Sequence, residues 1–268
     1  MNKYFTFDKD IANKQLFSLM VSIVNVVNGF IILMISTRYL PVEEYGNSFY
    51  IISIMAVARV TIFPGFEKTI PGYIVKGDLM TVHSVNLKSA KFGIFGLVGL
   101  VSYGLLIKDT DLKLMLFAAS FLYIPFYLSQ RIFQILAGLE KFYDIFLIRL
   151  IASIILLIIN FLVLVILNAN AKLYFIANLS TSVLIFSSVY FYYIKKEISV
   201  LHQSKIHNEK IHSALTKGKQ MTYAGLPTML LDPLITIYIG NLISMSDVSI
   251  YNIAKNIFSM TGNLIKSA

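Results

Sequence analysis

Long apolar stretches separated by short polar segments dominate this chain. Six follow one another between Leu16 and Ile194, and a seventh runs from about Gln220 to Ile243. A helix needs about 20 apolar residues to cross a bilayer, because hydrocarbon offers no hydrogen bonds to its backbone. The pattern therefore predicts an all-α integral membrane protein with about seven to eight transmembrane helices.

The spans are predicted at about 16–36, 48–66, 90–107, 112–130, 147–167, 173–194 and 220–243, with an eighth from about 248. Polar segments divide the chain into four parts. These are a cytoplasmic arm (1–15), a first bundle of six helices (16–194), a cytoplasmic linker (195–219) and the first two helices of an incomplete second bundle (220–268).

The composition agrees with a membrane protein, since 57% of the residues are hydrophobic and the mean hydropathy is +0.73. The net charge of +9 comes from Lys and Arg that are unevenly distributed. Sixteen lie in the N-terminal arm and the even-numbered loops, and four lie in the opposite loops. Because cytoplasmic loops are enriched in Lys and Arg, this predicts a cytoplasmic N-terminus and no nucleic-acid partner.

The residues for enzymatic chemistry are missing. The chain has no cysteine, and its four histidines are not spaced as metal ligands. It contains neither a Gly-rich phosphate loop of the Walker type nor a convincing pair of nucleophile and base. We therefore expect no enzymatic activity, no metal site and no cofactor.

Four segments resemble the polysaccharide and O-antigen flippases of the multidrug/oligosaccharidyl-lipid/polysaccharide exporter superfamily. They are Ile35–Gly46, Phe63–Tyr73, Gly138–Phe142 and Ser249–Ala254. The resemblance implies two bundles of six helices around a central cavity, with alternating access across the membrane. The chain would correspond to the first part of such a protein, without helices nine to twelve, and we expect it not to complete a transport cycle alone.

The resemblance also implies a function. The expected role is translocation of an undecaprenyl-pyrophosphate-linked oligosaccharide, such as an O-antigen, capsule or exopolysaccharide repeat unit, across the bacterial cytoplasmic membrane. The glycan and pyrophosphate would occupy a cationic cavity while the polyprenyl tail stays in lipid. Expected partners are this lipid-linked oligosaccharide, the bilayer, a polysaccharide polymerase and glycosyltransferases. The alternatives are an ion-coupled drug antiporter and an inactive or truncated scaffold of a polysaccharide assembly complex.

The substrate-cavity candidates are polar residues inside the predicted spans: Asn25, Asn28, Arg59, Asn252 and Lys255. Arg59 has no acidic residue in its own predicted span. A charge at the centre of a spanning helix costs about 2.5–3.5 kcal/mol, so it should face protein or water. Its planar guanidinium suits a bidentate contact with phosphate. The alternative is an Arg that snorkels to the interface or pairs with another helix.

The ion-coupling candidates are Asp232, Thr228 and Thr236, which share one helix face at i, i+4 and i+8. Pro227 and Pro233 flank the acid, and each removes a backbone donor, which predicts a break or kink. A carboxylate beside freed carbonyls is how discontinuous helices hold Na⁺ or H⁺. The alternative is a kinked helix in which Asp232 pairs with an Arg or Lys.

Overall fold

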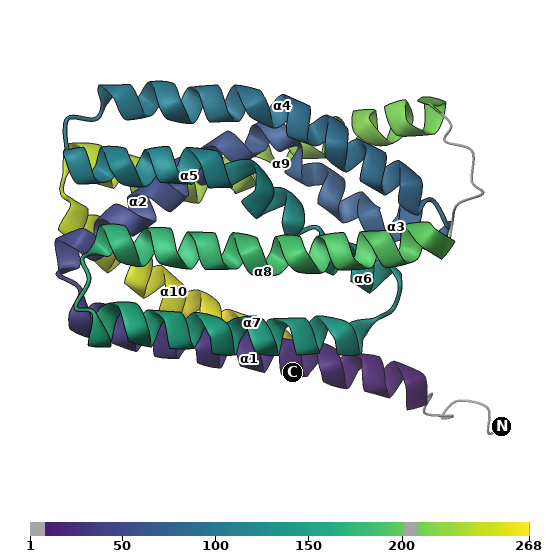
Figure 1. Ribbon diagram of the computed structural model, residues 1–268, viewed down its shortest axis with the longest axis horizontal. Coiled ribbons are helices and arrows are strands. Elements are labelled where there is room, and N and C mark those ends of the chain that lie inside the picture. Colours follow the sequence, from purple (N-terminus) through teal and green to yellow (C-terminus); the bar gives the residue numbers. More distant parts are fainter. Residues whose placement is uncertain (1–8, 201–207, 268) are drawn as a thin grey trace.

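The computed structural model describes residues 9–200 and 208–267, and within them every regular element is a helix (Figure 1). Part of the predicted arm (1–8), part of the predicted linker (201–207) and residue 268 lie outside the described residues. The elements are α1 (Lys9–Tyr39), α2 (Val42–Ala58), η1 (Arg59–Ile62), η2 (Pro64–Thr69), α3 (Ile70–Val75), α4 (Leu79–Leu106), α5 (Thr110–Ser129), α6 (Ile132–Gly138), α7 (Phe142–Asn160), η3 (Phe161–Ile166), α8 (Ala171–Val200), α9 (Asn208–Leu242) and α10 (Met245–Ser267). The all-α prediction is confirmed for the described part.

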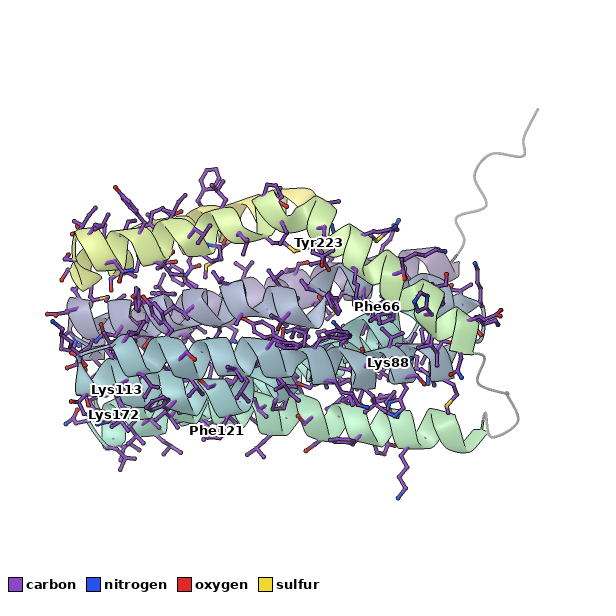
Figure 2. All side chains as sticks on the ribbon, turned by 90° about the horizontal axis from the view of Figure 1, so that it is seen from above. Phe66, Lys88, Lys113, Phe121, Lys172 and Tyr223 are labelled. Carbon is purple, nitrogen blue, oxygen red and sulfur yellow. The ribbon has the colours of Figure 1, made fainter. Side chains whose placement is uncertain are left out.

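Five helical segments are long and apolar enough to cross a membrane, and they belong to α1, α4, α5–α6, α7–η3 and α8. A sixth is obtained if α2–η1 and η2–α3 are counted as one bent span. This fits a multi-pass membrane protein. Phe121 projects outward with 73% of its surface exposed, as expected of a lipid-facing side chain, while Lys113 and Lys172 lie together at one end (Figure 2). Helices α9 and α10 are long enough but are not among the described segments that meet the criteria of apolarity and charge for a span, so the seventh and eighth spans stay predictions.

The second predicted span is broken. A continuous helix was expected over 48–66, but the two parts of this span meet at 65° around Phe63. Phe63 has a φ of 53°, in the left-handed region that a bulky residue rarely adopts. Pro64 has no N–H with which to continue the hydrogen bonds of a helix. The Pro-Gly pair at 64–65 therefore ends the first part of the span at Ile62. This is about one turn before residue 66, where apolarity alone placed the end.

Helix α9 packs closely against the broken segment. The backbone N–H of Gly65 donates to the hydroxyl of Thr222 at 2.9 Å. A Cβ on Gly65 would lie 2.3 Å from the backbone nitrogen of Thr222, so any larger residue would force α9 away. A Cβ on Gly218 would similarly lie 2.9 Å from Phe66. Small residues on both sides thus allow the close approach.

Helix α10 packs on the first half of α2. The hydroxyl of Ser249 donates to the carbonyl of Val42, and a Cβ on Gly46 would collide with the carbonyl of Met245. Through these contacts α9 and α10 pack along α2, which also contacts α4 and α5. The two helices assigned to a second bundle therefore form an extensive interface with the first.

The structure adds two details to this region. Residues 195–200 and 208–219 of the predicted linker are helical, because they extend α8 and α9 beyond their apolar parts. Of the break or kink predicted at Pro227 and Pro233, the break is absent, because α9 continues through both residues. Neighbouring helices and local adjustments allow a packed helix to tolerate the missing N–H groups.

Asn160, the strongly polar residue of the most apolar span, bonds to the neighbouring helix. Its side-chain amide donates to Asn178 on α8 at 2.9 Å and to the carbonyl of Leu156 at 2.6 Å. Asn178 donates back to Asn160 at 3.2 Å. Since neither amide is left to lipid, the pair fixes α7 against α8.

Candidate functional site

Arg131 is the most deeply buried cation among the described residues. It lies between α5 and α6 with 1% of its side chain exposed. One guanidinium nitrogen donates to Asn86 Oδ1 at 2.7 Å, and the other donates to the carbonyls of Ile62 and Phe63 at 2.5 and 3.2 Å. Arg131 follows the predicted span 112–130 and was counted among the cations of the next loop, but it is buried rather than solvated. It satisfies carbonyls at the point where the second span breaks.

A polar network extends from Arg131 to two further helices. Asn86 on α4 donates to the phenol oxygen of Tyr190 on α8 at 3.0 Å. His83, one turn earlier on α4, lies 3.3 Å from the same oxygen. Buried polar groups need such partners, because an unsatisfied group costs about 1–3 kcal/mol. The break, α4, α5–α6 and α8 are therefore held in one arrangement.

Arg59 pairs with Glu67 on the other side of the break. Its guanidinium lies 2.6 Å from the carboxylate, and their side chains are 34% and 22% exposed. The second carboxylate oxygen of Glu67 lies 3.7 Å from Nε of Arg131. Glu67 lies just beyond the predicted span of Arg59, so this pairing with the next helical segment is the alternative that the sequence left open. In a straight helix, residues eight apart are about 12 Å apart along the axis, so the bend brings the two together.

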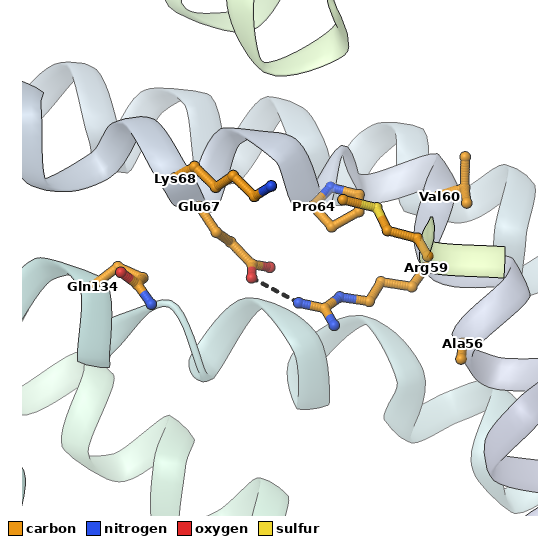
Figure 3. Close-up of a pocket in the computed structure, with 8 residues that line it drawn as sticks. Ala56, Arg59, Val60, Pro64, Glu67, Lys68 and Gln134 are labelled. Carbon is orange, nitrogen blue, oxygen red and sulfur yellow. Dashed lines mark hydrogen bonds and ion pairs between the residues drawn. The ribbon is translucent and has the colours of Figure 1, made fainter. Parts of the chain in front are cut away.

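Arg59, Glu67 and Arg131 lie beside a cavity of about 290 Å³. Residues of α2, η1, η2, α6 and α9 line this cavity (Figure 3). The lining residues are Ala56, Arg59, Val60, Pro64, Glu67, Lys68, Gln134 and Met229. Figure 3 shows Arg59 and Glu67 pointing toward each other, with Gln134 on a separate helix. We call this space the cationic cavity.

Both guanidinium groups also lie over aromatic rings. The Arg59 guanidinium carbon is 4.9 Å from the centre of the Tyr127 ring, and that of Arg131 is 5.6 Å from the centre of Phe66. Arg is attracted electrostatically to the face of such a ring. The Tyr127 ring therefore covers one face of the Arg59 guanidinium. The N–H groups at the edge of the guanidinium remain for Glu67 or for a competing anion.

The other substrate-cavity candidates do not line the cationic cavity. Asn25 is exposed on α1, whereas the side-chain oxygen of Asn28 is buried and has no hydrogen-bond partner within the described part of the chain. Asn252 is buried and donates to the carbonyl of Val248 at 2.9 Å. Lys255 forms an ion pair with Asp232 at 3.2 Å. Of the five candidates, Arg59 alone is placed at this cavity.

The ion-coupling candidates are on α9, and two of them, Asp232 and Thr236, contact α10. The second oxygen of Asp232 lies 3.4 Å from the Tyr251 hydroxyl, in addition to its pairing with Lys255. The Thr236 hydroxyl donates to the backbone carbonyl of Asp232 at 3.1 Å, while that of Thr228 donates to its own helix at Gly225. Asp232 is therefore paired with a Lys, which is the alternative that the sequence left open.

Sequence reasoning missed Glu67, Lys68, Arg131 and Gln134, all of which it placed beyond the ends of spans. One signal was present. The apolar stretch of α5 continues beyond Arg131 as far as Leu139, which is more typical of a buried segment than of a solvated loop.

Comparisons with protein-family models, curated proteins and solved structures found no match to this chain.

Proposed function

We propose that this chain belongs to an export system that moves an anionic, lipid-linked oligosaccharide across a bacterial cytoplasmic membrane. One observation carries the proposal: a cationic cavity inside a bundle of span-length helices. Arg59 and Lys68 line it and Arg131 borders it, while Glu67 supplies the one carboxylate of its lining. These side chains leave two positive charges uncompensated. A diphosphate that links a lipid to a sugar carries the complementary charge.

The chemistry of the cavity suits phosphate oxygens. Arg59 offers a planar pair of donors, Lys68 a mobile ammonium and Gln134 an uncharged amide. The Glu67 carboxylate accepts a hydrogen bond from the Arg59 guanidinium at 2.6 Å, as a phosphate oxygen would. When an anion enters, Glu67 still has Arg131 as a neighbour, so exchanging one anion for the other leaves no buried charge alone.

Nothing comparable favours a cation antiporter. Such a protein needs an acidic residue available to a cationic substrate, but Asp232 is paired with Lys255. The cationic cavity would repel the same substrate. The N-terminus, in this proposal, lies in the cytoplasm with the ends of α3, α6 and α8, as the uneven distribution of Lys and Arg indicates.

The test is export by Arg59→Ala in a strain whose surface polysaccharide depends on this protein. We expect surface polysaccharide to fall at least about tenfold, because a hydrogen bond to a charged group is worth about 1.5–3 kcal/mol. Arg59→Lys should restore export in part, since a point charge replaces the planar pair of donors. The matched control is Arg38→Ala, which removes an exposed Arg. Normal export by Arg59→Ala at an equal amount of membrane protein would contradict the proposal.

A further inference from the structure

A second cavity, of about 390 Å³, lies inside the bundle among α1, α2, α5, α8 and α10. We call it the apolar cavity, because aromatic and aliphatic side chains form most of its wall. One face of α2 runs along it through Tyr45, Phe49, Ile52 and Met55, at spacings of three and four residues. Ten residues of helix rise roughly 15 Å, so the cavity is elongated along α2.

Residues that line the apolar cavity adjoin residues that line the cationic cavity. Met55 lines the apolar cavity, and the next residue, Ala56, lines the cationic one. The Tyr127 ring lines the apolar cavity and lies beneath the Arg59 guanidinium at 4.9 Å. A ligand that fills both spaces would have an elongated apolar part joined directly to an anion.

The wall of the apolar cavity is mostly apolar, and two of its polar side chains are already engaged. Asn178 exchanges hydrogen bonds with Asn160, and the Tyr174 hydroxyl bonds to Ser36 at 2.8 Å. The Ser48 hydroxyl is buried and has no partner among the described residues. A sugar ring in this space would leave most of its hydroxyls unsatisfied, at about 1–3 kcal/mol each. A hydrocarbon chain has no such cost and supplies the contacts that an empty space lacks.

We propose that the apolar cavity binds the head-proximal part of the isoprenoid chain of a prenyl diphosphate, whose diphosphate lies in the cationic cavity. This inference rests on the proposed function and adds to it the position of the chain. It differs from the expectation that the whole tail stays in lipid. The sugar would then leave the cationic cavity on the side away from Met55, past the exposed Lys68.

The test uses the protein in phosphatidylcholine nanodiscs with a farnesyl diphosphate analogue that carries a diazirine on its last isoprene unit. After illumination, the modified peptides are identified by mass spectrometry. Ser48→Phe places a ring in the cavity without removing a hydrogen bond, and Ser48→Leu is the milder version should the first not fold. Ser48→Ala is the matched control that preserves the space. Binding of inorganic pyrophosphate is measured separately by calorimetry.

We expect adducts within 45–55 and 174–182, and competition by pyrophosphate. Filling the cavity with Phe should lower these adducts at least about tenfold, while Ser48→Ala stays near wild type. All three Ser48 variants should bind pyrophosphate normally. Adducts confined to lipid-facing residues such as Phe121, or insensitive to Ser48→Phe and Ser48→Leu, would overturn the inference. If pyrophosphate still bound in an Arg59-dependent way, the proposed function would survive that result.

One further outcome would count against both proposals. Cavity adducts that pyrophosphate does not displace, in a protein that shows no pyrophosphate binding, would mean that an apolar chain enters without an anionic head. That result would overturn both the diphosphate site and the prenyl diphosphate as its ligand.

Discussion

Arg131→Met is the substitution with the most clearly defined structural consequence. Methionine preserves much of the apolar volume of the side chain but has no donors. The carbonyl of Ile62 and Oδ1 of Asn86 then lose the guanidinium that donates to them. Glu67 keeps Arg59 at 2.6 Å, so no buried carboxylate is left alone. At about 1–3 kcal/mol for each orphaned acceptor, we expect a loss of stability of about 3 kcal/mol.

The assay is thermal stability of the detergent-solubilised protein carrying a C-terminal fluorescent protein. The fraction that remains monodisperse after heating is followed by size-exclusion chromatography. A loss of about 3 kcal/mol corresponds to a midpoint lower by roughly 6–12 °C for a chain of this size. The control Arg38→Met changes an exposed Arg and should shift the midpoint little.

A double-mutant cycle with Asn86→Leu isolates the contact itself. Adding Asn86→Leu to Arg131→Met should cost less than adding it to wild type, with a coupling of about 0.5–3 kcal/mol. An Arg131→Met midpoint within the error of wild type, or a shift equal to that of Arg38→Met, would refute the reasoning that this Arg stabilises the helix break.

Three further predictions concern other parts of the fold. Gly65→Val should lower the same midpoint by displacing α9, because even a Cβ would lie 2.3 Å from its backbone; an unchanged midpoint would contradict the close packing. Asp232→Ala and Lys255→Ala should each reduce the amount of inserted protein, since a lone charge in lipid costs about 2.5–3.5 kcal/mol. The double variant should recover part of that amount, as measured by quantitative immunoblotting of membranes. In this cysteine-free chain, a cysteine at exposed Ser213 should escape an impermeant thiol reagent in intact cells and one at exposed Asn168 should react; the reverse would overturn the proposed topology.

Much of the fold could be predicted from the sequence because the requirements for a membrane span are simple. The segments expected near 16–36 and 173–194 lie within helices of the structure, and those near 90–107 and 112–130 end one residue beyond theirs. Length and apolarity suffice for this prediction, since a chain in hydrocarbon must satisfy its own backbone hydrogen bonds. The ends were less well predicted, because polar residues extend α4, α8 and α9 beyond their apolar parts.

The candidate site could be predicted only in part. Arg59 was identified because a charge within an apolar stretch is rare and needs a partner. Its partner Glu67 was not identified, because the apolar pattern did not predict the bend at Phe63 that brings the two side chains together. Asp232 and Lys255 were each identified as separate sites, but their pairing depends on how α9 packs against α10.

Local sequence was enough to predict that the chain forms long apolar helices and how charge is divided between their two ends, because both properties are sums over neighbouring residues. Which of those charges are buried depends on how the helices pack. Arg131 interrupts an apolar stretch as a loop residue would, yet α4, α5–α6 and the broken second span surround it. Burial and pairing depend on residues that are distant along the chain, such as Arg131 and Asn86, and only the packing of the helices brings these together.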